Sequence, residues 1–299
     1  MLTRLLAVLA MMVLPASVLA EPDLPTQFTL SYAQDNGDGG SDVMPSWDVE
    51  GPYRFRSVDV QETGTMDLKL GMRWSTASDG TDDDVYFRPT LQYGIAENHE
   101  LILSFPMNLG DGGRYWGDGR EGNGDAHLGW QWKLVEESDS WVPAIAIYNE
   151  FRLPTGWKSN GVDWELMGIF SQTVAPDTRL HLNPFIKVIG QNFTVGDSDD
   201  WFGDVKTSRD FKAGLVLGCD RKFTWMEKNM VFNADYILDS GDLNGYRMQH
   251  EAQLGVDWLM SERETLSVIA TIGLDGDSQG DNFGLGFQYA LSLDAPWSF

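Results

Sequence analysis

The chain has 299 residues, and its 21 lysines and arginines stand against 45 aspartates and glutamates, a formal net charge of −24. So acidic a chain argues against nucleic acid as a partner, because phosphate contacts require a basic surface. The single cysteine, Cys219, excludes an intrachain disulfide and a cysteine-based metal cluster.

Residues 1–20 have the features of a secretory signal peptide. A basic residue, Arg4, precedes an apolar run over 5–14, and Pro15 and small residues lead to a predicted cleavage after Ala20. The apolar run is short for a bilayer span, and no later stretch reaches about eighteen apolar residues. We therefore expect no transmembrane helix in the mature chain.

Residues 21–62 form an N-terminal extension that is rich in Pro, Gly and Asp. From about Thr65 onward, polar and apolar residues alternate with a period of two, which predicts β-strands with one apolar face. Twelve strands are predicted, near 66–74, 85–95, 101–109, 125–134, 142–153, 162–174, 180–190, 210–219, 230–238, 247–259, 265–274 and 283–299.

The connections between these strands alternate in length and character. One set is long, acidic and glycine-rich, at 75–84, 110–124, 154–161, 191–209, 239–246 and 275–282; the other is mostly shorter, at 96–99, 136–140, 175–179, 220–229 and 261–264. Long loops at one end and short turns at the other are typical of outer-membrane β-barrels. A soluble β-sandwich also alternates, but strands of about nine to twelve residues match a tilted membrane span better.

The prediction is therefore an all-β fold, a transmembrane antiparallel β-barrel of about twelve strands over residues 63–299. It would lie in the outer membrane of a Gram-negative bacterium, in contact with its lipids. An open sheet edge in lipid would leave backbone groups unpaired, so the last strand should pair with the first near Met66–Trp74. The extension at 21–62 would be periplasmic, folded into the lumen, or an extra strand pair, and all three stay open.

The chain ends on an aromatic residue of the apolar face, Phe299. It resembles the terminal aromatic residue that outer-membrane barrels present to the barrel-assembly machinery. We interpret Phe299 as an assembly signal on the basis of that resemblance.

The polar face of the strands is the predicted lumen. Its channel-lining candidates are Lys69, Arg73, Arg88, Gln131, Glu150, Arg152, Glu165, Lys187, Asp235, Glu251 and Gln288. Charges of both signs along a channel set its selectivity, whereas the same charges paired across the barrel would plug it. A continuous narrow path and an occluded lumen are both compatible with this pattern.

Catalysis and metal binding have little support in the sequence. His250 is the histidine on the apolar face, it has no serine two residues to either side, and the chain contains no GxSxG motif, so no enzyme is predicted. The Asp-Gly fragments of the long loops do not fit the twelve-residue calcium-binding loop. We predict no catalytic residue, no metal site and no cofactor, with calcium in the acidic loops as the remaining option.

Three short motifs carry a family resemblance. One strand ends on Leu153, Pro154, Thr155 and Gly156, another is entered through Gly122, Gly124 and Asp125, and 101–107, LILSFPM, closes a strand on a proline. These motifs resemble a bacterial family of outer-membrane transporters named for the meta-pathway of phenol degradation. The resemblance implies passive transport of small compounds, aromatic ones among them, and carries no catalytic residues.

The main hypothesis is an outer-membrane channel for the passive passage of small molecules. The resemblance points to aromatic solutes, whereas a lumen with this many charges suits a polar or ionised one. The alternative is a closed barrel whose acidic outer loops bind a ligand, a cation or a partner.

Overall fold

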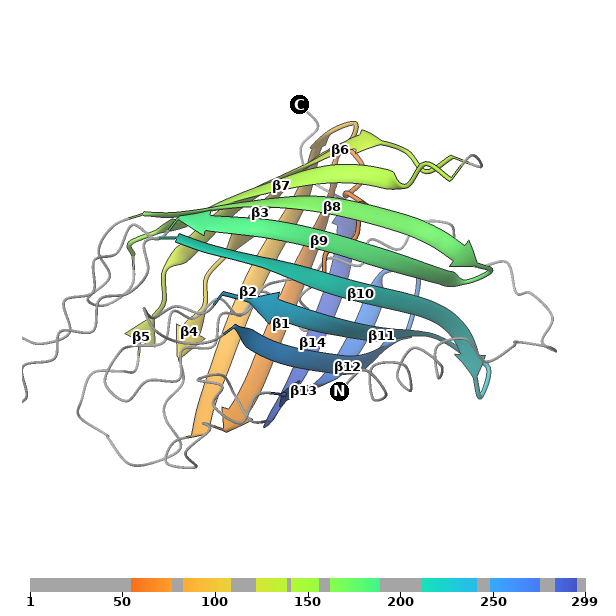
Figure 1. The fold of residues 1–299 in the computed structure, drawn as a ribbon. Coiled ribbons are helices and arrows are strands. Elements are labelled where there is room, and N and C mark those ends of the chain that lie inside the picture. The colour runs from red at the N-terminus through yellow and green to blue at the C-terminus, as the bar shows by residue number, and fades with distance from the viewer. Residues whose placement is uncertain are drawn as a thin grey trace, which may run out of the picture.

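A computed structural model describes residues 55–76, 83–108, 122–138, 141–155, 162–188, 211–240, 248–274 and 283–294. Their strands form one antiparallel sheet that closes on itself (Figure 1). The strands are β1 (Thr65–Thr76), β2 (Asp83–Ala96), β3 (His99–Ser104), β4 (Met107–Asn108), β5 (Gly122–Asn123), β6 (Ala126–Val135), β7 (Ala144–Leu153), β8 (Asp163–Ala175), β9 (Thr178–Val188), β10 (Phe211–Trp225), β11 (Lys228–Asp239), β12 (Gln249–Leu259), β13 (Glu264–Gly273) and β14 (Phe283–Asp294).

The predicted twelve-stranded barrel is confirmed. The short elements β4 and β5 are the continuations of β3 and β6, separated from them by Phe105–Pro106 and by Gly124–Asp125. Closure occurs where it was expected, because β1 pairs with β14 from Thr65↔Asp294 to Thr76↔Phe283 and with β2 on its other side. No helix among the described residues is long and apolar enough to cross a membrane.

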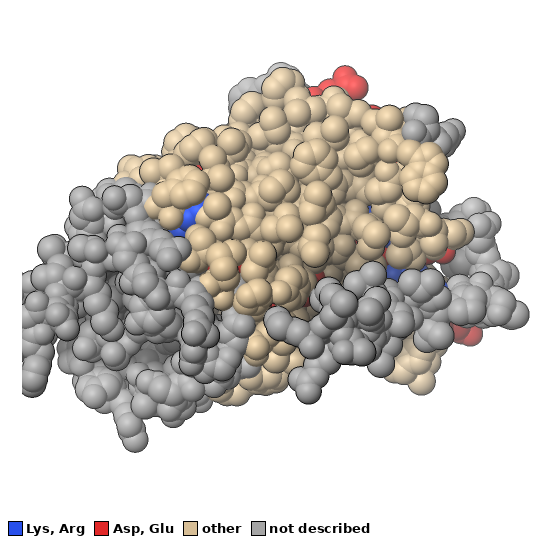
Figure 2. Space-filling model, in the orientation of Figure 1, with Lys and Arg blue, Asp and Glu red and all other residues tan. Residues whose placement is uncertain are grey.

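The outer face of the wall is apolar. Large side chains such as Met72, Leu128, Phe151, Leu217 and Phe287 are each between 42% and 47% exposed on it. One side of this wall is drawn in Figure 2, where charged side chains are sparse among the described residues. Because successive side chains of a strand point to opposite faces, the residues between these apolar ones point into the barrel.

The short connections are tighter than the sequence indicated. Residues 97–98, 176–177 and 226–227 are two-residue turns, with Asn98, Asp177, Met226 and Glu227 in the left-handed region at φ of 65°, 60°, 47° and 62°. The predicted loop at 220–229 is wrong, since β10 runs on to Trp225 and β11 begins at Lys228. Its charged residues suggested a loop, but Asp220 is buried on the inner face.

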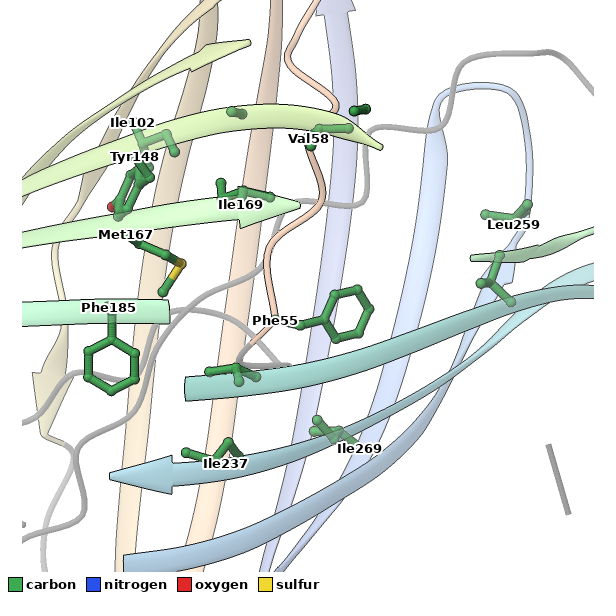
Figure 3. Close-up of a cluster of buried hydrophobic side chains, with 14 residues drawn as sticks. Phe55, Val58, Ile102, Tyr148, Met167, Ile169, Phe185, Ile237, Leu259 and Ile269 are labelled. Atoms are coloured by element: carbon green, nitrogen blue, oxygen red, sulfur yellow. The ribbon is translucent and has the colours of Figure 1, made fainter. Parts of the chain in front are cut away.

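The core of the molecule lies inside the barrel. Buried apolar side chains of the inner wall meet two residues that precede β1, Phe55 and Val58 (Figure 3). We call this group the lumenal apolar cluster; its principal wall members are Ile102, Tyr148, Met167, Ile169, Phe185, Val216, Ile237 and Ile269. The uniformly polar inner face predicted from sequence is thus only partly right, because β7 to β11 carry apolar residues on both faces.

Candidate functional site

A short stretch of the N-terminal extension occupies the lumen. Residues 55–62, which we call the lumenal segment, run inside the barrel before β1 begins (Figure 3). Phe55, Arg56, Ser57, Val58 and Gln61 are each at most 6% exposed. A position inside the lumen was one of the three alternatives for residues 21–62; residues 21–54 lie outside the described part of the chain.

The N-terminal end of the lumenal segment is held by side chains of the wall. The Phe55 amide donates to Asp235 Oδ2 at 3.3 Å. The Asn183 side chain imitates a strand partner of Arg56, since its Oδ1 accepts from the Arg56 amide at 2.8 Å and its Nδ2 donates to the Arg56 carbonyl at 3.2 Å. The Arg56 guanidinium lies 3.5 Å from the centroid of the Tyr148 ring, a cation–π contact.

The Phe55 ring is packed between two wall residues. It stacks on the His181 ring, with centroids 4.6 Å apart and planes inclined by 20°. On another side it lies over Gly218, where a Cβ atom would come within 2.4 Å of Phe55 Cγ. Glycine at position 218 therefore makes room for the ring.

The C-terminal end of the lumenal segment is fixed near the rim from which β1 starts. Gln131 Nε2 donates to the carbonyls of Ser57 at 2.9 Å and Asp59 at 3.0 Å. The Gln61 amide donates to Glu100 Oε2 at 2.8 Å. At Gly94, a Cβ would approach the Glu62 carbonyl oxygen to 2.1 Å, so the chain passes directly against the wall there.

A partly buried ionic cluster links the lumenal segment to β9 and β10. Arg179 donates to Asp220 Oδ2 through Nη2 at 2.6 Å and through Nε at 3.0 Å, and it donates through Nη1 to Asp59 Oδ2 at 2.6 Å. Burial raises the pKa of the Asp59 carboxyl, but the charge and hydrogen bond of the Arg179 guanidinium lower it more, so this pKa lies below the ordinary value of 3.8. The lumenal segment is thus anchored by a charge-assisted contact.

The same cluster contains residue types of a hydrolytic triad. Ser171 Oγ lies 2.8 Å from His181 Nδ1, and His181 Nε2 lies 3.2 Å from Asp220 Oδ2. His181 lies on the inner face of β9 and its two partners come from the neighbouring strands β8 and β10, so the sequence alone did not reveal this group. Two features distinguish this group from a hydrolytic triad. Asp220 is already bound by Arg179, and the Phe55 ring covers one face of the His181 imidazole.

All eleven channel-lining candidates are buried on the inner side of the wall, between 2% exposed for Gln131 and 9% for Glu251. Several of them contact neighbours within the barrel. Glu150 Oε1 lies 2.7 Å from His127 Nδ1 and the other Glu150 oxygen accepts from Tyr148, while Arg152 pairs with Asp163 at 3.2 Å. Gln131 and Asp235 bind the lumenal segment. The remaining candidates on the inner wall are Lys69, Arg73, Arg88, Glu165, Lys187, Glu251 and Gln288.

The three family-like motifs meet in space. The Gly124 amide donates to the Pro106 carbonyl at 2.8 Å, and a Cβ on Gly124 would lie 3.0 Å from the Pro106 ring. Thr155 Oγ1 accepts from the Ala126 amide at 2.8 Å, so it caps the start of β6 after Leu153 ends β7. Pro154 and Asp125 flank this junction, and Gly156 lies outside the described residues. The geometry assigns these residues a structural role in the wall.

Other predicted sites fall largely outside the described residues. The assembly-signal residue Phe299 and most of each long acidic loop belong to the undescribed ranges, so the calcium option stays a prediction. Within the described ranges, no group of three or more His, Cys, Asp and Glu side chains is arranged to hold a metal ion. On the outer face, His99 stacks with Trp130 and Trp132, at centroid distances of 5.7 and 5.4 Å.

A closed antiparallel barrel with an apolar exterior and a largely polar interior defines the outer-membrane class of β-barrel proteins. No family model and no curated protein matches the chain. Among solved structures, the chain is similar to the COG4313 outer membrane channel from Pseudomonas putida F1, with a TM-score of 0.61 and 12% identity over 79% of this chain and 98% of that one.

Two further solved structures are similar at lower scores. The NanC porin gives a TM-score of 0.49 with 12% identity, covering 76% of this chain and 98% of that one. The CymD monoaromatic hydrocarbon channel gives 0.43 with 9% identity, covering 78% and 89%. The closure of the sheet and the similarity to the COG4313 channel show that the fold of this chain is that of outer-membrane β-barrels.

Proposed function

We propose that this protein is a channel in the outer membrane of a Gram-negative bacterium, through which small molecules pass passively, and that it is not an enzyme. The observation that carries the proposal is the way in which the lumenal segment is held inside the barrel. Residues 55–62 are not paired as a strand, and they contact the wall through side-chain hydrogen bonds and through the ion pair of Asp59 with Arg179. Such contacts can break and re-form while the strands of the barrel wall stay paired.

The lumen favours small solutes that combine an apolar part with a polar or charged one. The lumenal apolar cluster offers aromatic and aliphatic contacts through Tyr148, Met167 and Phe185. Charged side chains such as Arg152, Lys187 and Glu165 lie on the same inner wall. This combination reconciles the aromatic solutes implied by the family resemblance with the ionised ones suggested by the charges. The solute passes through the barrel when the lumenal segment is displaced from its position in the lumen.

The test is solute flux through the purified, folded barrel in liposomes. Asn183→Ala removes both side-chain hydrogen bonds to Arg56, and we expect it to raise the flux of a small uncharged sugar over that of the wild type. The matched control is Asn229→Ala, which truncates an asparagine of the barrel wall at the start of β11. Ile237 of the lumenal apolar cluster lies near the other end of this strand. Absence of flux from both variants and from the wild type would contradict a channel.

The closed barrel is the second candidate, and the filled lumen favours it. In that case the acidic outer loops bind a cation or another ligand, and the barrel only anchors them. Calcium would then raise the thermal stability of the folded protein or protect the loops from proteolysis, while bilayers stay electrically silent. A conducting barrel without a calcium response would exclude this candidate.

A further inference from the structure

The lumenal segment presents an aromatic ring and a carboxylate to adjacent positions of one strand. Phe55 stacks on His181, and Asp59 binds Arg179. Arg179 and His181 are two residues apart on the inner face of β9, about 6.5–7 Å along the strand. A ring and a carboxylate are thus recognised side by side on the wall.

The two carboxylates on Arg179 differ in their environment. Asp220 belongs to the wall, its side chain is 3% exposed, and it also contacts His181. The Asp59 side chain is 32% exposed, and Arg179 itself is 21% exposed. A guanidinium has five N–H donors in a planar fork, so Arg179 retains donors for a second carboxylate when Asp220 is bound. Asp59 occupies the more accessible of the two places.

We propose that Arg179 and His181 form a subsite for an aromatic carboxylate, and that Asp59 and Phe55 are its tethered occupants at rest. This proposal rests on the proposed channel function and names a solute class for it. A solute carboxylate on Arg179 restores the charge that leaves with Asp59, and its ring takes the place of Phe55 on the imidazole. A neutral aromatic compound lacks the partner for Arg179, and an aliphatic carboxylate lacks the stacking ring.

Solute binding and release of the lumenal segment are coupled in this arrangement. A ligand that binds where the lumenal segment lies competes with it for the same side chains. By linkage, a change that weakens binding of the segment to the wall raises the affinity for the ligand. The aromatic carboxylate therefore favours the state in which the segment has left β9. Selectivity and opening would be set at one place, near the rim from which β9 starts.

The experiment measures binding of 3-phenylpropanoate to the full chain in detergent micelles by calorimetry. This probe separates its ring from its carboxylate by two methylenes; 3-phenylpropan-1-ol and hexanoate are the neutral and ring-free controls. Asp59→Asn should raise the affinity for 3-phenylpropanoate by about tenfold, the worth of one charge-assisted hydrogen bond. Asp177→Asn, an exposed turn residue near the same rim, should leave the affinity unchanged.

Arg179→Gln should abolish binding of the acid, and Arg179→Lys should keep only part of it because lysine lacks the fork. The heat-modified mobility of each variant on a denaturing gel reports whether the barrel has folded. If Arg179→Gln fails to fold, the Asp59→Asn and Asp177→Asn pair still decides. Equal affinities in that pair, or equal binding of the acid and the alcohol, would overturn the proposal.

The outcome is separable from that of the channel proposal. Flux of an uncharged sugar through liposomes does not depend on the Arg179 subsite. Sugar flux without preferential binding of 3-phenylpropanoate would refute the subsite and leave the channel intact. Preferential binding without any flux would refute the channel and leave the subsite as a ligand site in a closed barrel.

Discussion

Gly218→Ala is predicted to displace the lumenal segment without unfolding the barrel. The added Cβ would lie 2.4, 2.6 and 2.8 Å from Phe55 Cγ, Cβ and Cδ1, all closer than a real Cβ contact. Overpacking of a filled interior typically costs about 1–3 kcal/mol. If the segment bears that cost by moving, its displaced population rises by about 5- to 150-fold.

The control is Gly71→Ala, on the same barrel wall. There the added Cβ would lie 3.5 Å from the Arg88 carbonyl oxygen, an ordinary contact. Hydrogen exchange of residues 55–61, measured by mass spectrometry in detergent, reports the position of the segment. We expect faster exchange in Gly218→Ala, exchange as in the wild type in Gly71→Ala, and folded, heat-modifiable barrels in both.

Two results would refute this reasoning. Equal exchange of residues 55–61 in Gly218→Ala and Gly71→Ala would show that Phe55 does not occupy the space above Gly218. Faster exchange throughout β10 and its neighbours, with no preference for the lumenal segment, would show that the wall yields and the segment does not.

Three further predictions concern other contacts. Thr155→Val leaves the Ala126 amide without its side-chain acceptor and should lower the free energy of unfolding in urea by about 1–3 kcal/mol, whereas Thr155→Ser should not; equal losses would contradict the capping role. Because the pKa of Asp59 is depressed, its pair with Arg179 stabilises the bound segment at neutral pH and is lost only as the pH falls below 3.8 and through the depressed value. The protection of residues 57–61, measured relative to the intrinsic exchange rate at each pH, should therefore stay constant from neutral pH down to 3.8 and fall below that value, and Asp59→Asn should abolish this fall. A fluorophosphonate probe should not label Ser171, since Asp220 is neutralised by Arg179; labelling that is lost in Ser171→Ala would reopen hydrolysis.

The barrel itself could be predicted because one physical requirement repeats along the chain. Every strand must turn apolar side chains to lipid, so alternation marks β1 as clearly as β14, and closure follows from the cost of an open edge in lipid. The same rule failed at Asp220, whose charge suggested a loop. Its burial is made possible by Arg179 on the next strand, a contact across 41 positions that local sequence does not reveal.

The alternation of polar and apolar residues could not predict the position of the lumenal segment. Residues 55–62 form no regular element, and their partners are remote in sequence; Phe55 binds Asp235 across 180 positions. The apolar residues Met167 and Phe185 were overlooked for a related reason. They share the inner face with Glu165 and Lys187, and a strand that is apolar on both faces gives no alternation to read. The glycines at 94 and 218 are the local signals that a chain passes close to the wall.

Single-channel recording of the purified, folded wild-type protein in planar bilayers tests the central claim most directly. The account predicts discrete conductance steps, and a greater fraction of time in the open level for Gly218→Ala than for Gly71→Ala. Silent bilayers from folded wild type and from both variants would contradict it.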